Sequence, residues 1–473
     1  MHRRAQRRPD VPDVADPTAD VAGAEGSAPR ATSRRQLLRG AGAAAALGAV
    51  GTVGAGAFAA TRLAQPEIDP RTVVSLWSGT VAYDSRGTRR PVGGRGDRLE
   101  LGPGTRLAAD LPETSAERRR SAGFDDGTAA WRDRLTDSLP QAPLLHDLAA
   151  SALQDLWILG DDLPAPVAGW SPSWRYLWPR DAAFCTVALA RVGHLDRAVE
   201  ALAHLQSLQA PDGWFEARYD PDTGRAPDRR RRQFDGTGLL LWAAAEVEQV
   251  AQSDGGPRAE VLRERLAPLI TTSVDTLLSQ TQEGAGIPPV SPDYWERRER
   301  SVTLWTMAAT LAGLRAGARL TDEPALHRAA ETFTVLLEGT FGASGYQRYR
   351  AGGGADSARA LLDATGHHGL VPTAWLIDLR RELARPGGGI APGASWRADG
   401  VSWTPSTSLL ALALARAGEH EPATEILSWL TEHRTAEGSL PEKVLFDGRP
   451  AEVAPLAWTA ANTVLALDCL ARG

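Results

Sequence analysis

The chain has 473 residues, of which 43% are hydrophobic and 23% charged, a composition typical of a soluble globular protein. Its net charge of −6 argues against nucleic acid as the main partner. The two cysteines, Cys185 and Cys469, cannot form a disulfide framework, and no Cys/His cluster has the spacing of zinc ligands. No glycine-rich phosphate loop is present either, so we expect neither a metal nor a cofactor.

The amino-terminal part of the chain is typical of a targeting segment. Residues 1–32 are polar and aperiodic, and we expect them to be disordered. Residues 33–60 begin with SRRQLLRG and continue as an Ala/Gly-rich apolar run, a pattern that predicts a twin-arginine export signal. Cleavage after Ala57-Phe58-Ala59 fits this signal, whereas an uncleaved run of about 20 apolar residues would anchor the protein in a membrane. Both interpretations place the remaining chain outside the cytoplasm, extracellular or associated with the cell envelope.

The rest of the chain divides into a short first segment and a long helical one. Residues 66–140 contain β-like runs, TVVSLWSGTVAY and RLELGPG, among Gly, Pro and Arg, and predict a short β-rich or irregular segment. Residues 141–473 predict twelve helices. The odd-numbered candidates are amphipathic, such as 195–209, and the even-numbered ones are apolar nearly all round, such as 181–193.

This alternation predicts a particular architecture. A helix that is apolar on every side is buried on every side, whereas an amphipathic helix has one wet face. Six hairpins with an inner and an outer helix each give an all-α fold, the (α/α)6 barrel. The eighth candidate, 356–366, is short and fits the pattern poorly. An α-solenoid would also alternate, but with a steady repeat length that this chain lacks.

Unusual sequence lies in the loops that lead into the even-numbered helices, which would all open at one end of the barrel. These loops are rich in Trp, Arg and acids, and read WSPSWRYLWPRDAAF (170–184), RRQFDGTG (231–238), SPDYWERRERSV (291–302), SWRADGVSW (395–403) and GSLPEKV (438–444). Aromatic faces mixed with acids are typical of a carbohydrate site. Simpler explanations remain for each residue: Asp181 and Asp235 as N-caps, Glu442 as a surface charge and the tryptophans as core.

Two glutamates are candidates for glycosidic bond cleavage, which needs a proton donor and a second carboxylate. Glu296 follows Trp295, an apolar neighbour that would keep a carboxyl group protonated. Glu442 precedes Lys443, the only lysine in the chain, and a nearby cation favours the ionised form that a base requires.

The ordered set WPRDAAF (178–184), DGWFEARYDPDTG (212–224), QFDGTG (233–238), DYWERR (293–298), LPEKV (440–444) and PLAW (455–458) resembles glycoside hydrolase family 15, which includes glucoamylases, glucodextranases and some trehalases. The resemblance spans residues 144–470. It implies an (α/α)6 barrel and inverting hydrolysis of α-glucosidic bonds, with Glu296 as general acid and Glu442 as general base. It also implies that Arg180 and Asp181 hold the terminal sugar of an oligo- or polysaccharide attacked from its end. The matching wall residues are Trp178, Trp295 and Trp403.

Three departures from the family pattern affect specificity. Arg297 stands where many members have a second acid, Lys443 stands where Gln is frequent, and the segment before the barrel is much shorter than the β-sandwich of many prokaryotic members. Arg297, Arg397 and the run 229–232 would suit an anionic sugar. We therefore place Arg297 with the substrate-binding residues.

The sequence predicts an exported, exo-acting glycoside hydrolase, and three alternatives compete with it. A sugar-binding protein of the cell envelope would keep the aromatic site without turnover. An inverting phosphorylase would replace the base by a phosphate site, and Glu442 argues against this. A serine hydrolase would need a nucleophile elbow, and no G-x-S-x-G is present.

Overall fold

The computed structural model describes residues 73–253, 255 and 257–472. The predicted polar amino terminus and export signal, residues 1–60, lie outside the described residues. Within the described ranges no helix is both long and apolar enough to span a bilayer.

The segment before the barrel begins with a β-hairpin, whose first strand lies within the predicted β-like run 72–83. The second predicted run, 98–104, contains no strand and only an isolated bridge from Leu101 to Ala108. Strands β1 (Thr80–Tyr83) and β2 (Arg89–Val92) pair antiparallel. Two helices that we did not predict follow, α2 (Ala116–Gly127) and α3 (Ala129–Ser138). Their apolar positions are sparse: α2 buries Phe124 and Ser121, and α3 buries Trp131 and Leu135. The helical periodicity was therefore weak in the sequence.

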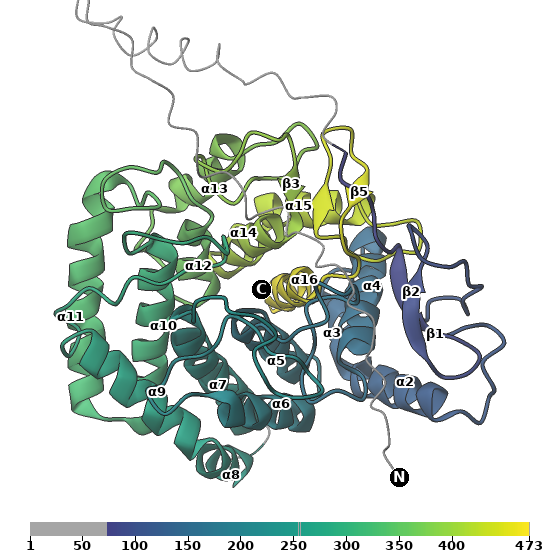
Figure 1. Ribbon diagram of the computed structural model, residues 1–473, viewed down its shortest axis with the longest axis horizontal. Helices are drawn as coiled ribbons and strands as arrows, with labels where there is room; N and C mark the ends of the chain where they lie inside the picture. Colours follow the sequence, from purple (N-terminus) through teal and green to yellow (C-terminus); the bar gives the residue numbers. More distant parts are fainter. Residues whose placement is uncertain (1–72, 254, 256, 473) are drawn as a thin grey trace, which may run out of the picture. The chain divides into compact units, whose positions relative to one another are not determined.

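Six helices form a closed inner ring. They are α5 (Pro179–Arg191), α7 (Asp235–Ser253), α10 (Leu304–Thr321), α12 (Ala358–Ala364), α14 (Thr404–Arg416) and α16 (Ala457–Leu470). Each contacts the next in this order, and α16 contacts α5 (Figure 1). Close packing within the ring requires Gly238 of α7, since a Cβ there would lie 2.0 Å from the carbonyl oxygen of Ala309 in α10.

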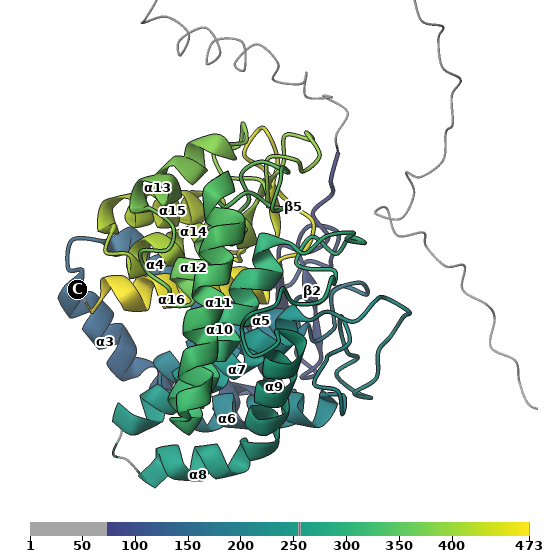
Figure 2. The ribbon, with the colours of Figure 1, turned by 90° about the vertical axis from the view of Figure 1, so that its left-hand side faces the viewer.

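The outer helices cover this ring. They are α4 (Pro143–Gly160), α6 (Leu195–Leu208), α9 (Ala267–Gln280), α11 (Pro324–Phe341), α13 (Thr373–Glu382) and α15 (His420–Glu432). Figure 2 shows α9 and α11 beside α10, which both of them contact. The helix predicted over 258–280 is two helices, α8 (Pro257–Arg265) and α9, because Pro268 cannot continue a helix from the preceding turn.

Burial follows the predicted alternation. Residues 404–415 of α14 are all buried, whereas α6 buries only the stripe that includes Leu195, Leu202 and Leu205. All seven residues of α12 are buried, so the short eighth candidate is an inner helix despite its poor fit. The (α/α)6 barrel is confirmed.

A small sheet joins two of the loops that precede inner helices. Strand β3 (Ser402–Trp403) pairs with β4 (Lys443–Val444), and β4 pairs with β5 (Pro450–Ala451). Trp403 lies opposite Lys443 in this register. The loops before α14 and α16 are thereby held together, next to Glu442.

Candidate active site

Arg180 joins the loops that precede three inner helices. It lies in the first turn of α5, directly after Trp178 and Pro179, and is 4% exposed. Its Nη1 donates to Asp235 Oδ2 at 2.7 Å and Gln233 Oε1 at 2.9 Å, and its Nη2 donates to Glu296 Oε1 at 2.8 Å. Residues far apart in the sequence thus meet at one guanidinium group, at the amino-terminal ends of α5, α7 and α10.

Glu296 is accessible but held by polar partners. Besides Arg180, Gln233 Nε2 donates to its Oε1 at 2.9 Å and Arg230 Nη1 donates to its Oε2 at 3.1 Å, while 28% of its side chain remains exposed. Its φ of 53° is left-handed, an uncommon conformation for a residue with a side chain. The expectation that Trp295 gives this carboxyl group an apolar environment is wrong, because its hydrogen-bonding partners are two guanidinium groups and an amide.

Asp181 is a buried carboxyl group beside the same guanidinium. The N-cap of α5 is Trp178, so the interpretation of Asp181 as an N-cap is excluded. Its Oδ1 lies 3.7 Å from Arg180 Nε. Burial raises the pKa of Asp181 to about 7; Arg180 opposes this shift, and the charges of Glu296 and Asp235 add to it.

Glu442 is a second buried carboxyl group. Its backbone is fixed by hydrogen bonds from its N–H to Val453 O (2.8 Å) and from Thr404 N to its carbonyl (3.0 Å). Lys443 Nζ lies 3.4 Å from Oε2, so the predicted cation is in place. Burial nevertheless outweighs Lys443 and Arg397 and raises the pKa of Glu442 to about 7. Ionisation of Glu442 at neutral pH is therefore less favoured than the sequence neighbour suggested.

Four tryptophans connect the neighbourhoods of the two glutamates. Trp295 packs edge-on against Trp396 (ring centroids 4.8 Å apart), and Trp396 packs against Trp403 (5.2 Å), over which Lys443 Nζ lies at 4.5 Å. Trp458 lies 5.7 Å from the Arg180 guanidinium. The indole N–H groups of all four are buried and find no acceptor in the described part of the chain.

The remaining predicted residues lie at the edges of this arrangement. Trp178 packs against Trp174 at 5.8 Å and under the guanidinium of Arg218 at 5.1 Å. Arg297 lies over the rings of Trp295 and Trp396, at 6.0 and 5.9 Å. Its suggested contact with an anionic sugar stays a prediction. No group of three or more His, Cys, Asp and Glu that could hold a metal ion occurs among the described residues.

Arg348, which no sequence pattern singled out, anchors the loop that carries Glu296. It is 1% exposed and donates to Asp293 (3.0 Å), Glu299 (2.6 Å) and Asp356 (3.1 Å). Its guanidinium also lies 3.6 Å from the centre of the Trp295 ring. Two of its partners, Asp293 and Glu299, lie three residues before and three residues after Glu296. The sequence alone does not show that these two acids share one arginine.

Replacing Arg348 with methionine is expected to destabilise the protein by at least about 3 kcal/mol, because buried carboxylates would lose their only guanidinium partner within the described residues. Urea denaturation of the two proteins measures the loss. Replacing Arg381, whose ion pair with Asp378 is exposed, is the matched control and should cost less than about 1 kcal/mol. Equal effects of the two changes would contradict the anchoring role.

Comparison with protein families and with curated proteins finds no match. Solved structures do match. A glycosidase in complex with glucose is 22% identical, with a TM-score of 0.57 over 70% of this chain and 98% of that one. A glycoside hydrolase family 15 glucoamylase from Hypocrea jecorina is 16% identical (TM-score 0.53, 72% of each chain), and a bacterial glucoamylase complexed with acarbose is 15% identical (TM-score 0.52, 68% and 55%).

These likenesses establish the class of fold. The described chain has the six-hairpin barrel of glucoamylases and related glycosidases, so the resemblance to glycoside hydrolase family 15 is confirmed at the level of the fold.

Proposed function

We propose that the protein is a glycoside hydrolase that cleaves sugars from the ends of α-glucosidic oligo- or polysaccharides with inversion. The observation that carries the proposal is the position of Glu296 and Glu442 in the loops before α10 and α16, between which a row of packed tryptophans extends, their indole N–H groups unpaired among the described residues. Structural neighbours described as a glycosidase with glucose and a glucoamylase with acarbose support a sugar substrate.

Glu296 serves as the general acid in this proposal. Arg180 is shared by Asp181, Asp235 and Glu296, and Arg230 adds a second guanidinium at Glu296. The exposed part of Glu296 allows it to pass a proton to the leaving oxygen. Arg180 and Asp181 would bind hydroxyls of the terminal sugar, which favours attack at a chain end.

Glu442 serves as the general base that takes a proton from the attacking water. Its Oε2 accepts no well-aligned hydrogen bond among the described residues, and its nearest cation, Lys443 Nζ, lies at 3.4 Å, so Oε2 keeps capacity to accept from that water. Its raised pKa, about 7, makes it a strong base once ionised. Inversion requires the two carboxyl groups to flank the sugar with room for the water, about 6.5–9.5 Å apart.

The pH dependence of the reaction tests the role of Glu442. If Glu442 must be ionised, kcat/KM should rise with pH through about 7. Lys443 lowers the pKa of Glu442, so Lys443→Met should move this acid limb to higher pH. A pH–rate profile of both proteins measures the shift. A limb that stays in place would show that another group, such as Asp181, controls it.

We also propose that the protein is exported by the twin-arginine route, on the strength of Arg34 and Arg35 ahead of an apolar run. The Arg34→Lys, Arg35→Lys double variant should then accumulate in the cytoplasm when cells are fractionated. Normal export of this variant would contradict the proposal.

A further inference from the structure

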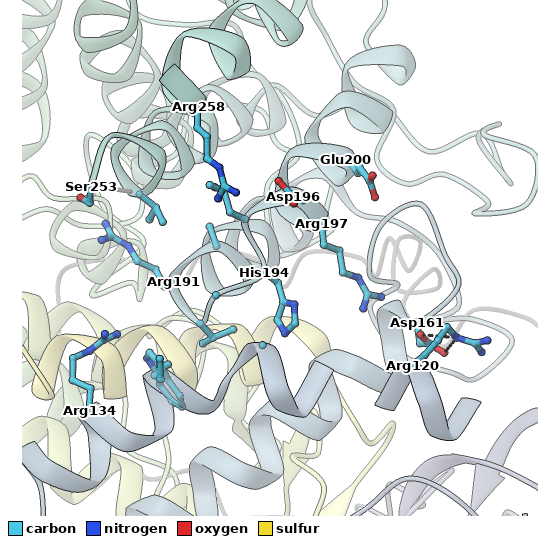
Figure 3. A pocket seen from close by; sticks show the side chains of 18 of the residues that line it. Arg120, Arg134, Asp161, Arg191, His194, Asp196, Arg197, Glu200, Ser253 and Arg258 are labelled. Atoms are coloured by element: carbon cyan, nitrogen blue, oxygen red, sulfur yellow. Dashed lines mark hydrogen bonds and ion pairs between the residues drawn. The ribbon is translucent and has the colours of Figure 1, made fainter. Parts of the chain in front are cut away.

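Two cavities adjoin at the end of the barrel where the inner helices terminate, and both are lined by Arg191 and Arg472. The larger, about 1220 Å³, lies beside α3 and the start of α6 (Figure 3). Its Arg120 is already paired with Asp161 at 2.9 Å. The smaller, about 330 Å³ and here named the arginine cavity, differs because its lining includes buried donors without acceptors.

Most charges of the arginine cavity have a structural explanation. Glu246 of α7 accepts hydrogen bonds from Arg191 (3.1 Å), Arg319 (3.2 Å) and Arg416 (3.0 Å). Burial of Glu246 opposes its ionisation, but the three guanidinium groups prevail and lower its pKa to about 2. Each arginine lies in the last turn of an inner helix, where a cation offsets the helix dipole. These residues alone would require no ligand.

The buried ring of His367 has no such structural explanation, because one of its nitrogens lacks a partner within the described residues. It is 3% exposed, and its Nδ1 lies 3.1 Å from Arg315 Nη1. A guanidinium can only donate, so Nδ1 is the acceptor and carries no hydrogen. Burial and the charge of Arg315 lower the pKa of His367 to about 3, so the ring is neutral and its hydrogen is on Nε2. This Nε2–H group has no acceptor among the described residues.

Trp242, which also lines the cavity, has a second buried donor without an acceptor within the described ranges. It is 2% exposed, and its indole N–H also lacks an acceptor in the described part of the chain. A buried donor left unpaired is destabilising, because it has lost its hydrogen bond to water. Two such donors in one cavity, next to guanidinium groups with unused N–H bonds, indicate a ligand that only accepts hydrogen bonds.

We propose that the arginine cavity binds a phosphate group, either inorganic phosphate or the phosphate of a small ester. Its oxygens would accept from His367 Nε2, Trp242 Nε1 and the free N–H groups of Arg315, whose planar fork suits phosphate. The cavity lies at the small end of the range for ligand pockets, about 300–1,000 Å³. Arg319 and Arg472 border it with side chains 49% and 44% exposed, so this side of the cavity lies at the surface. Arg472 pairs there with Asp468, a second carboxylate in the lining besides Glu246.

Calorimetric titration of the full chain with inorganic phosphate tests the proposal, with sodium chloride at equal ionic strength as the blank. We expect saturable binding that His367→Leu and Arg315→Met each weaken by about tenfold or more. Arg381→Met, an exposed arginine on an outer helix, should leave the affinity unchanged. A parallel titration with a hexose phosphate distinguishes the two sources, since the tighter binder names the ligand class.

Two results would overturn the proposal: no saturable binding of either phosphate beyond the chloride blank, or unchanged affinity in both cavity variants. Circular dichroism and glycosidase activity of the variants establish that they fold. Because the arginine cavity and the candidate active site lie at opposite ends of the inner helices, loss of phosphate binding with retained hydrolysis separates this proposal from the proposed function.

Discussion

Replacing Glu442 with glutamine is expected to lower kcat by about 10³-fold, since the variant cannot take a proton from the attacking water. The amide has the shape of the carboxyl group, so the fold and substrate affinity should persist. Glu421→Gln, an exposed change in the first turn of α15, is the control and should keep full activity. Initial rates on an α-glucoside measure the effect. Near-normal turnover would remove Glu442 from the mechanism.

The same variant should change how stability depends on pH. Glu442 has a pKa of about 7 in the folded protein against an ordinary value of 4.5, so the folded state holds a proton that the unfolded state releases. This contribution is fully present below about pH 4.5 and is lost as pH rises through about 7. Glutamine does not titrate, so Glu442→Gln should gain stability relative to the parent protein between pH 5 and pH 8. Urea denaturation at both pH values measures the gain, and a constant difference would contradict the buried, raised-pKa carboxyl group.

Replacing Glu296 with glutamine is expected to lower kcat by about 10³-fold on natural glucosides, because the leaving oxygen would lose its proton donor. A glucosyl fluoride needs little proton donation to its leaving group, so its hydrolysis should fall far less. Glu442→Gln, in contrast, should lose activity on both substrates. This difference separates the acid from the base. Arg300→Gln, an exposed change in the same loop, is the control.

Comparable losses on the glucoside and the fluoride would contradict the role of Glu296 as general acid. They would leave it as a positioning group, bound to Arg180 and Arg230 as the structure has it. Full activity on both substrates would exclude it from the reaction altogether.

The fold could be predicted because the apolar residues of each helix show whether all of its faces or only one face is buried. All residues of the stretch 404–415 are apolar or small, and α6 has its apolar stripe, so inner and outer helices differ visibly in sequence. The break at Pro268 was not predicted, because the amphipathic pattern continues through it. Helices α2 and α3 were not predicted, because they contain few apolar residues.

The site could be located from the sequence, but its electrostatics could not. The loops that hold Arg180, Asp181, Glu296 and Glu442 were identified by their composition. The partners that set the charge of each group are distant in sequence: Arg180 meets Glu296 across 116 positions. The adjacent residues in the sequence therefore did not predict the environment of either glutamate. Trp295 does not provide the partners of Glu296, and at Glu442 burial outweighs Lys443.

The most direct test of the proposed function is proton NMR of the first products formed from α-1,4, α-1,6 and α,α-1,1 glucosides. Two carboxyl groups that act as acid and base on opposite faces of the sugar invert the anomeric centre. We predict that β-glucose appears first, from at least one of the three linkages. Initial release of α-glucose, or no release from any linkage, would contradict the account.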